Sequence, residues 1–302
     1  MRVAITGASG LIGTALGRSL TEDGHEVLRL VRRSPHDMAE VEWDPSGGEV
    51  DTARLDGVDA VVHLAGAPLG PARWTAEYKR RIRDSRIMGT RTLATALAAM
   101  ENPPAHLLSG SAVGFYGDTG SDTATEHSPP GSGFLAGVVR EWEAATEPAE
   151  RAGVPVTHLR TGIVLARSGG MLGTVLPLFR LGLGGKLGNG RQFVSWISLR
   201  DEVAAIRFLL GRGDITGPVN LCAPGAVSNA AYTRAVAKAV RRPAVFTVPA
   251  FAMRAALGGF ADEAALVSQR VTPQRLLDSG FSFHHSDVRT AVSDIVGGGS
   301  GP

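Results

Sequence analysis

Three glycines near the amino terminus have the spacing of a loop that binds a dinucleotide. Gly7, Gly10 and Gly13 directly follow an apolar run and open an amphipathic stretch, which predicts a strand, a turn and a helix. In such a unit the first glycine permits the tight turn, the second lets the backbone approach a pyrophosphate, and the third lets the helix pack closely on the strand. The N–H groups at the start of the helix then favour phosphate. The sequence therefore predicts a cofactor loop, with a ligand-free strand–helix turn as the alternative; the loop comprises Thr6, Gly7, Ser9, Gly10, Leu11, Ile12 and Gly13.

The residues after the second expected strand bear on which dinucleotide would bind. An NAD site usually carries an acidic residue about 20 positions past the glycines, where it accepts hydrogen bonds from the ribose hydroxyls. Here the strand over 26–31 is followed by Arg32 and Arg33, with no acidic residue at its tip. A guanidinium group matches the geometry of a 2′-phosphate. This pattern favours NADP(H) over NAD(H), and a pair of solvated arginines is the alternative.

A basic segment over residues 73–86 indicates an anion-binding surface. Arg83 and Arg86 lie three positions apart, so they share one face of a helix expected over 75–100. Together they could clamp a carboxylate or phosphate of the substrate, while Trp74 could form one wall of its pocket. The alternative is a solvated basic face.

The composition excludes several other classes of protein. With 31 basic and 29 acidic residues the net charge is only +2, so no global field attracts nucleic acid. The single cysteine, Cys222, cannot form an internal disulfide, and no cluster of cysteines predicts a metal site. No apolar run reaches the roughly 18 residues of a membrane span, and the apolar run at the N-terminus is too short for a signal peptide. We expect a cytoplasmic protein whose partner is a small-molecule substrate, with a homodimer left open, and neither nucleic acid nor a membrane.

The elements that must position these residues indicate a doubly wound α/β fold. Short apolar runs alternate with longer amphipathic stretches in the first half, which is typical of stacked βαβ units. The runs are rich in Val, Leu and Ile with little alternation, as expected for a parallel sheet that is covered on both faces. The expected strands are 3–6, 26–31, 60–64, 106–110 and 155–159, and the expected helices are 11–23, 75–100, 134–152 and 199–211.

The alternation of apolar and amphipathic runs ends near residue 170, which indicates a second part of the chain. Residues 181–190 are rich in glycine, and beyond them we expect short strands near 193–197 and 219–221 and helices from Asn229, Ala250 and Pro273. We predict a Rossmann core over 1–170, to whose sheet later strands could return. A smaller C-terminal α/β lobe on the substrate side would span 171–296 and include a helical segment over 249–296. The glycine-rich tail over 297–302 is expected to be disordered.

Blocks throughout the chain match one known group of proteins. They read TGASGLIG at 6–13, DAVVHLAG at 59–66, SGSAVGFYG at 109–117, LRTGIVL at 159–165 and GRQFVSWI at 190–197. These blocks resemble extended short-chain dehydrogenases/reductases, and specifically the atypical "epimerase family protein" branch of the NAD(P)-dependent epimerase/dehydratase-like proteins. Residues 249–296 resemble the uncharacterised C-terminal domain of that branch. The resemblance covers essentially the whole chain.

The resemblance implies further site residues by position. It places Leu64, Ala65, Gly66 and Arg160 among the residues that bind NADP(H), with the substrate between the Rossmann core and the C-terminal lobe. Ser111, directly after the strand expected over 106–110, stands where the superfamily carries its active-site serine or threonine. We therefore expect Ser111 to donate a hydrogen bond to the substrate or transition state, unless it only closes the strand.

The chain departs from the superfamily at the pair that transfers protons. Its members use Tyr-x-x-x-Lys, in which the ammonium group lowers the pKa of the phenol. No such pair exists in this chain, and Phe134 and Val138 stand at the matching positions. Tyr116, on the loop after the strand expected over 106–110, is the expected replacement as a general acid or a substrate hydrogen bond, and packing beside the cofactor is the alternative.

Two functions follow from these observations. The first is an NADP(H)-dependent oxidoreductase or epimerase-like enzyme that acts on a small polar carbonyl or hydroxyl substrate. The second is a non-catalytic sensor or partner protein that binds NADP(H), a reading that the missing pair supports. We predict the enzyme.

Overall fold

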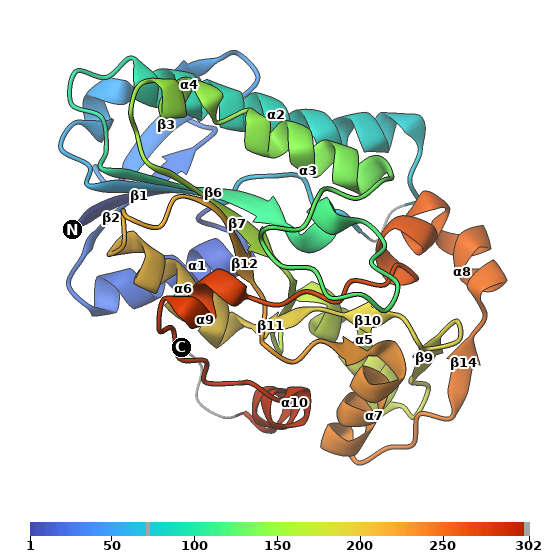
Figure 1. The fold of residues 1–302 in the computed structure, drawn as a ribbon. Coiled ribbons are helices and arrows are strands. Elements are labelled where there is room, and N and C mark those ends of the chain that lie inside the picture. Colours follow the sequence, from blue (N-terminus) through green and yellow to red (C-terminus); the bar gives the residue numbers. More distant parts are fainter. Residues whose placement is uncertain (71–72, 299–302) are drawn as a thin grey trace.

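A sheet of eight strands forms the centre of the molecule (Figure 1). A computed structural model describes residues 1–70 and 73–298 of the chain. The strands are β1 (Arg2–Thr6), β2 (Glu26–Val31), β3 (Glu40–Asp44), β4 (Glu49–Val50), β5 (Ala60–His63), β6 (His106–Ala112), β7 (Val156–Thr161) and β12 (Gly217–Leu221). Their order is β12-β7-β6-β5-β1-β2-β3-β4, and every neighbouring pair is parallel except β3 and β4.

Helices cover both faces of this sheet (Figure 1). On one face lie α2 (Ala76–Ala98), α3 (Phe134–Ala144) and α4 (Glu147–Arg151), and on the other lie α1 (Leu11–Glu22) and α6 (Leu199–Leu210). Short 3-10 helices, η1 (Thr52–Leu55) and η2 (Val113–Tyr116), follow β4 and β6. This arrangement confirms the predicted fold class, a Rossmann-like doubly wound α/β sheet.

Alternate residues of the central strand explain why the sheet is covered twice. In β1, Val3 and Ile5 are fully buried in one apolar cluster with Leu16 of α1. Ala4 points the other way, into a second cluster that contains Leu97 of α2. Because successive side chains of a strand point to opposite faces, a run such as Val-Ala-Ile is stable only where both faces are buried.

A smaller lobe is built from the later part of the chain. Its elements are β8 (Ile163–Leu165), α5 (Gly170–Arg180), β9 (Gly185–Leu187), β10 (Phe193–Val194), β11 (Trp196–Ser198), β13 (Val227–Ser228), α7 (Asn229–Val240), β14 (Phe246–Val248), α8 (Ala250–Leu257), the π-helical turn η3 (Ala261–Ala265) and α10 (Val288–Gly297). Three pairs of short strands form, β8 with β11, β10 with β13 and β9 with β14. A separate apolar cluster joins α5, α7 and α10. Three later elements belong with the main sheet: β12 pairs with β7, and α6 and α9 (Gln274–Asp278) contribute buried residues to the same apolar cluster as β1.

Three local predictions differ from the structure. The helix expected over 134–152 is two helices, α3 and α4, because Pro148 lies at the start of α4, where it cannot supply the N–H that a continuous helix needs. The β3–β4 hairpin was not predicted, because its buried Val41 and Trp43 alternate with acidic residues. Helix α5 was not predicted either, since glycines begin and interrupt its pattern. Helix α10 lies at the end of the helical segment that was predicted over 249–296.

The tail over 297–302, which was expected to be disordered, is described only in its first two residues. Gly297 is the last residue of α10 and Gly298 follows it, whereas 299–302 lie outside the described residues. Within residues 1–70 and 73–298, no helix combines the length and the apolar character needed to cross a membrane.

Candidate functional site

The carboxyl ends of β1, β5, β6 and β7 meet at one edge of the sheet, and the predicted site residues gather there. Gly7 follows β1 with a φ of +67°, in the left-handed region that favours glycine. A Cβ atom on Gly7 would lie only 2.8 Å from the Leu64 carbonyl carbon, and one on Gly13 would collide with the Gly7 carbonyl oxygen. The first and third glycines are therefore required by the strand–turn–helix unit itself.

Gly10 has a different role, because its backbone is in an ordinary extended conformation with a φ of −78°. A Cβ atom there would approach the Gly7 carbonyl oxygen at 3.2 Å, which is tight but tolerable. Gly10 precedes α1, whose first turn has neither a side-chain cap nor an acidic residue. Ser9 and Gly10 are exposed, and Leu11 and Ile12 are half-buried at the helix start. The N-terminus of α1 thus presents uncapped N–H groups beside a backbone without side chains, which suits a phosphate.

Thr6 lies behind this loop rather than on its surface. Its fully buried hydroxyl accepts hydrogen bonds from the N–H groups of Leu64 and Ala65 at 3.0 and 3.1 Å. Thr6 was predicted to bind the cofactor, but its side chain instead fixes the position of the loop after β5.

Since the Thr6 hydroxyl accepts these two bonds, its own proton is donated to His63 Nδ1, which lies 2.7 Å from Thr6 Oγ1. Burial lowers the pKa of His63 to about 4, so the ring is neutral at pH 7 and carries its proton on Nε2. Nε2–H then donates to Thr90 Oγ1 at 3.0 Å, which also accepts a bond from Trp142 Nε1 at 2.9 Å. This buried chain of hydrogen bonds joins β1, β5, α2 and α3 at the edge of the sheet.

The two arginines after β2 have different surroundings. Arg33 donates two hydrogen bonds to Glu40, at 2.7 and 2.8 Å, and this pairing lowers the pKa of the Glu40 carboxyl to about 2. Arg32 is exposed and makes no hydrogen bond or ion pair with any residue that the structure describes. Of the pair predicted to bind a 2′-phosphate, only Arg32 is therefore free to do so.

Arg83 and Arg86 do not form the clamp that was predicted from their spacing. Arg83 donates to Asp84 at 3.1 Å and to Glu141, and both carboxylates are about half exposed. Arg86 is half-buried, where its guanidinium faces the Trp142 ring at 5.1 Å and lies against Gly66 of the loop after β5. It forms no ion pair within the described part of the chain, and its one hydrogen bond goes to the Ile82 carbonyl at 3.0 Å.

Side chains from the α2 region hold the loop after β5. Trp74 Nε1 donates to the Leu69 carbonyl at 2.8 Å, and the Tyr78 hydroxyl donates to the Pro68 carbonyl at 2.8 Å. The Ser85 hydroxyl accepts a bond from Ala67 N at 3.0 Å. Trp74 is buried, so it fixes the loop and does not present an open wall to a pocket.

Apolar and aromatic groups occupy the place of the missing Tyr-x-x-x-Lys pair. The Phe134 ring packs edge-on against Trp74, which also contacts Phe260 of the C-terminal segment. Val138 is 3% exposed. The carboxylate of Glu263 accepts hydrogen bonds from the backbone N–H groups of Phe134 and Leu135, each at 3.0 Å. The C-terminal segment therefore caps α3 at the position where the superfamily has its tyrosine.

A buried polar network lies at the ends of β6 and β7. Arg160 donates from Nε and Nη2 to the two oxygens of Glu143, at 2.8 and 2.9 Å, and its guanidinium stacks on the Phe115 ring at 3.5 Å. The Ser111 hydroxyl donates to Glu143 Oε1 at 2.6 Å. Burial opposes ionisation of Glu143, yet the bonds from Arg160 and Ser111 hold its pKa below the usual value. Glu143 is thus an ionised carboxylate in a mostly covered site.

Tyr116 belongs to the same network and is not placed as a free acid. Its hydroxyl donates to Asn220 Oδ1 at 2.7 Å and accepts a bond from Arg160 Nη1 at 2.9 Å. Burial raises the pKa of Tyr116 to about 12, and the ring is 4% exposed. Arg160, predicted to bind the cofactor, likewise has its guanidinium occupied by Glu143 and Tyr116. Both residues support the site from behind.

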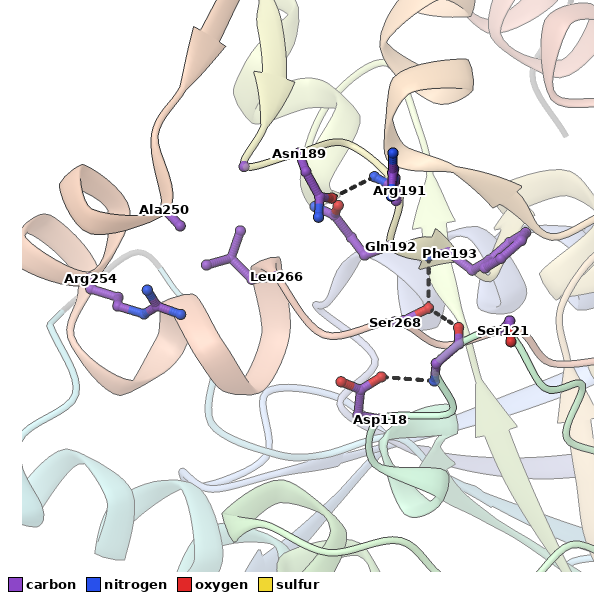
Figure 2. A pocket seen from close by; sticks show the side chains of 12 residues that line it. Asp118, Ser121, Asn189, Arg191, Gln192, Phe193, Ala250, Arg254, Leu266 and Ser268 are labelled. Atoms are coloured by element: carbon purple, nitrogen blue, oxygen red, sulfur yellow. Dashed lines mark hydrogen bonds between the residues drawn. The ribbon is translucent and has the colours of Figure 1, made fainter.

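A separate open cavity of about 560 Å³ lies between the smaller lobe and the loop that leaves β6 (Figure 2). Its lining includes Asp118, Ser121, Arg191, Phe193, Arg254 and Ser268. The Ser268 hydroxyl accepts a bond from Phe193 N at 3.0 Å and donates to the Gly120 carbonyl, so it joins the two walls. Arg254 pairs with Asp262 at 2.9 Å, whereas the Arg191 guanidinium has no partner among the described residues. Neither the glycine loop nor Ser111 lines this cavity.

One carboxyl group near the site makes the stability of the fold depend on pH. Glu202 of α6 is fully buried and accepts one bond, from the Thr161 hydroxyl at 2.9 Å, while its Oε2 has no partner in the described structure. Burial raises the pKa of Glu202 to about 8. Because this value lies above that of the unfolded chain, folding retains a proton and the free energy of unfolding falls as pH rises from about 4.5 to 8.

Glu202→Gln is therefore expected to flatten this dependence. In the wild type, the Glu202 carboxyl lowers the free energy of unfolding by at most about 1.4 kcal/mol per pH unit across this window. The glutamine amide has the same shape but does not ionise, so the variant lacks this contribution. Urea midpoints at pH 5, 6, 7 and 8 should fall for the wild type and less steeply for Glu202→Gln. Glu49→Gln, at an exposed position, should follow the wild type; parallel curves for all three proteins would contradict the assignment.

Glu143, Asn220 and Thr90 were not predicted as members of the site. Glu143 had one usable signal, because this acidic residue lies five positions after Val138 on the same expected helix. Its pairing with Arg160 is seen only in the structure. Asn220 and Thr90 had none, since their contacts depend on strands and helices far apart in the chain.

Comparisons with known proteins identify the family of this chain. The model of the NAD dependent epimerase/dehydratase family matches residues 3–222, and that of a domain of unknown function, DUF1731, matches residues 248–295. An epimerase family protein of Mycobacterium leprae is 46% identical over 96% of this chain and 94% of its own length.

Solved structures match the whole chain as well. The human epimerase family protein SDR39U1, crystallised with NADPH, is 31% identical, with a TM-score of 0.90 over 98% of this chain and 99% of that one. A nucleoside-diphosphate sugar epimerase from Corynebacterium glutamicum is 37% identical, with a TM-score of 0.81 over 98% of this chain and 58% of that one. The predicted resemblance to the epimerase family, with its uncharacterised C-terminal domain, is confirmed.

Proposed function

We propose a function for this chain from the premise that it belongs to the NAD dependent epimerase/dehydratase family. It is an NADP(H)-dependent oxidoreductase or epimerase-like enzyme that acts on a small polar carbonyl or hydroxyl substrate. The observation that carries the proposal is the uncapped N-terminus of α1 behind Gly7 and Gly10, with the free Arg32 at the tip of the neighbouring strand. The similar human protein, crystallised with NADPH, supports the choice of cofactor.

The described residues fit a bound dinucleotide phosphate. The N–H groups of Leu11 and Ile12 would bind its diphosphate, and Arg32 its 2′-phosphate. Arg86 is a half-buried cation without an acidic partner, against the loop of Leu64, Ala65 and Gly66. Burial lowers the pKa of Arg86 to about 10, so it remains charged at pH 7 and requires an acceptor. We assign Arg86 to the cofactor rather than to the substrate.

These two arginines should differ in which cofactors they affect. A hydrogen bond to a charged group contributes roughly 1.5–3 kcal/mol, or about 10- to 150-fold in affinity. Arg32→Ala should weaken NADPH by about that factor and leave NADH nearly unchanged, because NADH lacks the 2′-phosphate. Arg86→Ala should weaken both. Calorimetric titration of each variant with both cofactors measures the four affinities.

Arg83→Ala is the matched control for Arg86→Ala, since it lies one turn away on the same helix but pairs with Glu141 at the surface. It should leave both affinities unchanged. Equal losses for Arg83→Ala and Arg86→Ala would remove Arg86 from the cofactor site, and a wild type that prefers NADH would overturn the assignment of Arg32.

The substrate would lie at the sheet edge where the glycine loop and Ser111 meet, so that its reacting carbon can approach the cofactor. We place the protein in the cytoplasm because its single cysteine cannot form an internal disulfide. We infer a small-molecule partner, since the nearly balanced charge gives no field that attracts nucleic acid.

A second function is favoured by one observation. Phe134 and Val138 fill the place of the Tyr-x-x-x-Lys pair with apolar side chains, and Tyr116 is fully hydrogen bonded. A protein that binds NADP(H) as a sensor or partner, without turnover, would need no such pair. Purified protein that binds NADPH but never oxidises it with any of a broad set of carbonyl compounds would favour this alternative.

A further inference from the structure

The ionised carboxylate of Glu143 beside Ser111 is unexplained by cofactor binding. Glu143 lies on α3, the helix from which the superfamily's tyrosine and lysine are missing, and reaches the end of β6 from its last turn. A carboxylate of which 11% is exposed costs free energy unless it is paired. Arg160 pairs both of its oxygens, and Ser111 adds a third hydrogen bond.

The direction of the Ser111 hydrogen bond determines what this serine can do. An ionised carboxylate only accepts hydrogen bonds, so the Ser111 proton points to Glu143 Oε1. The lone pairs of Ser111 Oγ are then left to accept a bond from a ligand. Ser111 was predicted to donate to the substrate, but in this arrangement it is an acceptor, and the group that it recognises is a hydroxyl.

Other titratable groups near this edge are less suited to take a proton. The Tyr116 hydroxyl already donates to Asn220, and the neutral His63 ring is enclosed by Thr6 and Thr90. His158 is 9% exposed and lies next to Thr146 at 3.0 Å, one layer behind Glu143. Glu202 also accepts a bond from a hydroxyl at this edge, that of Thr161, but burial raises the pKa of Glu202 to about 8, so it is mostly protonated at pH 7. Glu143 is the ionised carboxylate that a hydroxyl connects to the end of β6.

We infer that Ser111 and Glu143 form the proton-transfer group of this site, with Ser111 contacting a hydroxyl of the substrate and Glu143 taking the proton through it. The inference rests on the proposed function and names the substrate class, an alcohol. Arg160 is a positioning residue that keeps Glu143 ionised and aimed at Ser111.

The step balances as an alcohol oxidation. The substrate O–H bond breaks and its proton passes to Ser111 Oγ, while the Ser111 proton passes to Glu143 Oε1. The carbinol carbon loses hydride as its C=O bond forms. The acceptor for that hydride would be NADP⁺, held at the N-terminus of α1 and by Arg32. Glu143 then releases the proton to solvent, and the original hydrogen bond is restored.

The charges that face Glu143 set the pH range of this step. Arg160 and His158 of β7 both favour its ionised form, and Ser111 of β6 does so by its hydrogen bond. Tyr116 is hydrogen bonded to Arg160 and Asn220 and not to Glu143. Because the Glu143 pKa lies below its usual value, oxidation should persist well below pH 6. A histidine base, with a pKa of about 6.5, would lose activity as pH falls through 7, and a tyrosine base, with a pKa of about 10, would lose it at still higher pH.

The first test needs no substrate. Infrared difference spectra between the wild type and Glu143→Gln isolate the Glu143 carboxylate band in protein with and without NADP⁺. We expect an ionised band at pH 5 in the wild type, and Ser111→Ala should raise the pH at which this band disappears. A protonated Glu143 at pH 6, or no change in Ser111→Ala, would overturn the pairing.

The second test measures turnover with a panel of small secondary alcohols and NADP⁺, as absorbance gained by NADPH. Ser111→Ala and Glu143→Gln should each lower the wild-type rate by about 10²–10⁴-fold with unchanged NADP⁺ affinity. Ser109→Ala, a buried serine two positions earlier on β6 with an unpartnered hydroxyl, is the control and should keep the wild-type rate. Ser111→Ala leaves the Arg160–Glu143 pair in place, so it stays informative if Glu143→Gln is unstable.

The outcomes separate the two levels of the proposal. An active wild type with equally active Ser111→Ala and Glu143→Gln variants contradicts the proton-transfer group alone. A wild type that binds NADP⁺ but oxidises no alcohol between pH 5 and 9 contradicts the enzymatic function, and the proton-transfer group with it.

Discussion

Gly10→Val is expected to abolish NADPH binding while leaving the fold intact. The backbone of Gly10 is compatible with any residue, and a Cβ atom would contact only the Gly7 carbonyl oxygen, at 3.2 Å. The two further methyl groups of valine would occupy the space that a diphosphate needs in front of α1. Saturating NADPH, at about 100 times its dissociation constant, should stabilise the wild type by about 2.7 kcal/mol and the variant not at all.

Gly17→Val provides the matched control for this prediction. Gly17 lies on the same helix, where the nearest atom to an added Cβ is Val27 Cγ1 at 3.9 Å. Its NADPH affinity and melting temperature should stay close to those of the wild type. Undiminished NADPH binding by Gly10→Val would show that the diphosphate lies elsewhere, whereas a collapsed melting temperature without ligand would make the turn a structural requirement only.

Arg160→Met is expected to produce the largest loss of stability. It removes a guanidinium whose side chain is 4% exposed, and leaves the Glu143 carboxylate buried without its partner. Breaking a buried pair in this way costs about 3–5 kcal/mol. At about 2–4 °C per kcal/mol for a chain of this size, the melting temperature should fall by roughly 6–20 °C in thermal denaturation.

Two controls separate this buried pair from an ordinary surface pair. Arg83→Met breaks an ion pair whose partners are 46% and 48% exposed, so its cost should stay within about 1 kcal/mol. Arg160→Met combined with Glu143→Leu should recover part of the lost stability, since no unpaired carboxylate remains. Equal losses for Arg160→Met and Arg83→Met would mean that the network is not closed as described.

The sheet and its glycine loop could be predicted because their signals are local. The apolar run of β1, the spacing of Gly7, Gly10 and Gly13, and the charged tip of β2 each lie within a few residues of sequence. The β3–β4 hairpin could not be predicted in this way, because its buried Val41 and Trp43 alternate with acidic residues, of which Glu40 pairs with Arg33.

The partners of the site residues could not be predicted from spacing. Arg83 and Arg86 are one turn apart, yet tertiary contacts direct one to Glu141 and the other to the loop at Gly66. Likewise Tyr116 follows Ser111 by five residues, but Asn220, more than 100 residues away, determines where its hydroxyl points. Spacing defined the candidates, and packing between distant elements assigned their roles.

Titration of the wild-type protein with NADPH and NADH tests the central claim most directly. Calorimetry in one buffer should show one NADPH per chain, bound about 10- to 150-fold more tightly than NADH, as expected for a 2′-phosphate that is held by Arg32. Failure to bind either dinucleotide, or a preference for NADH, would contradict the account.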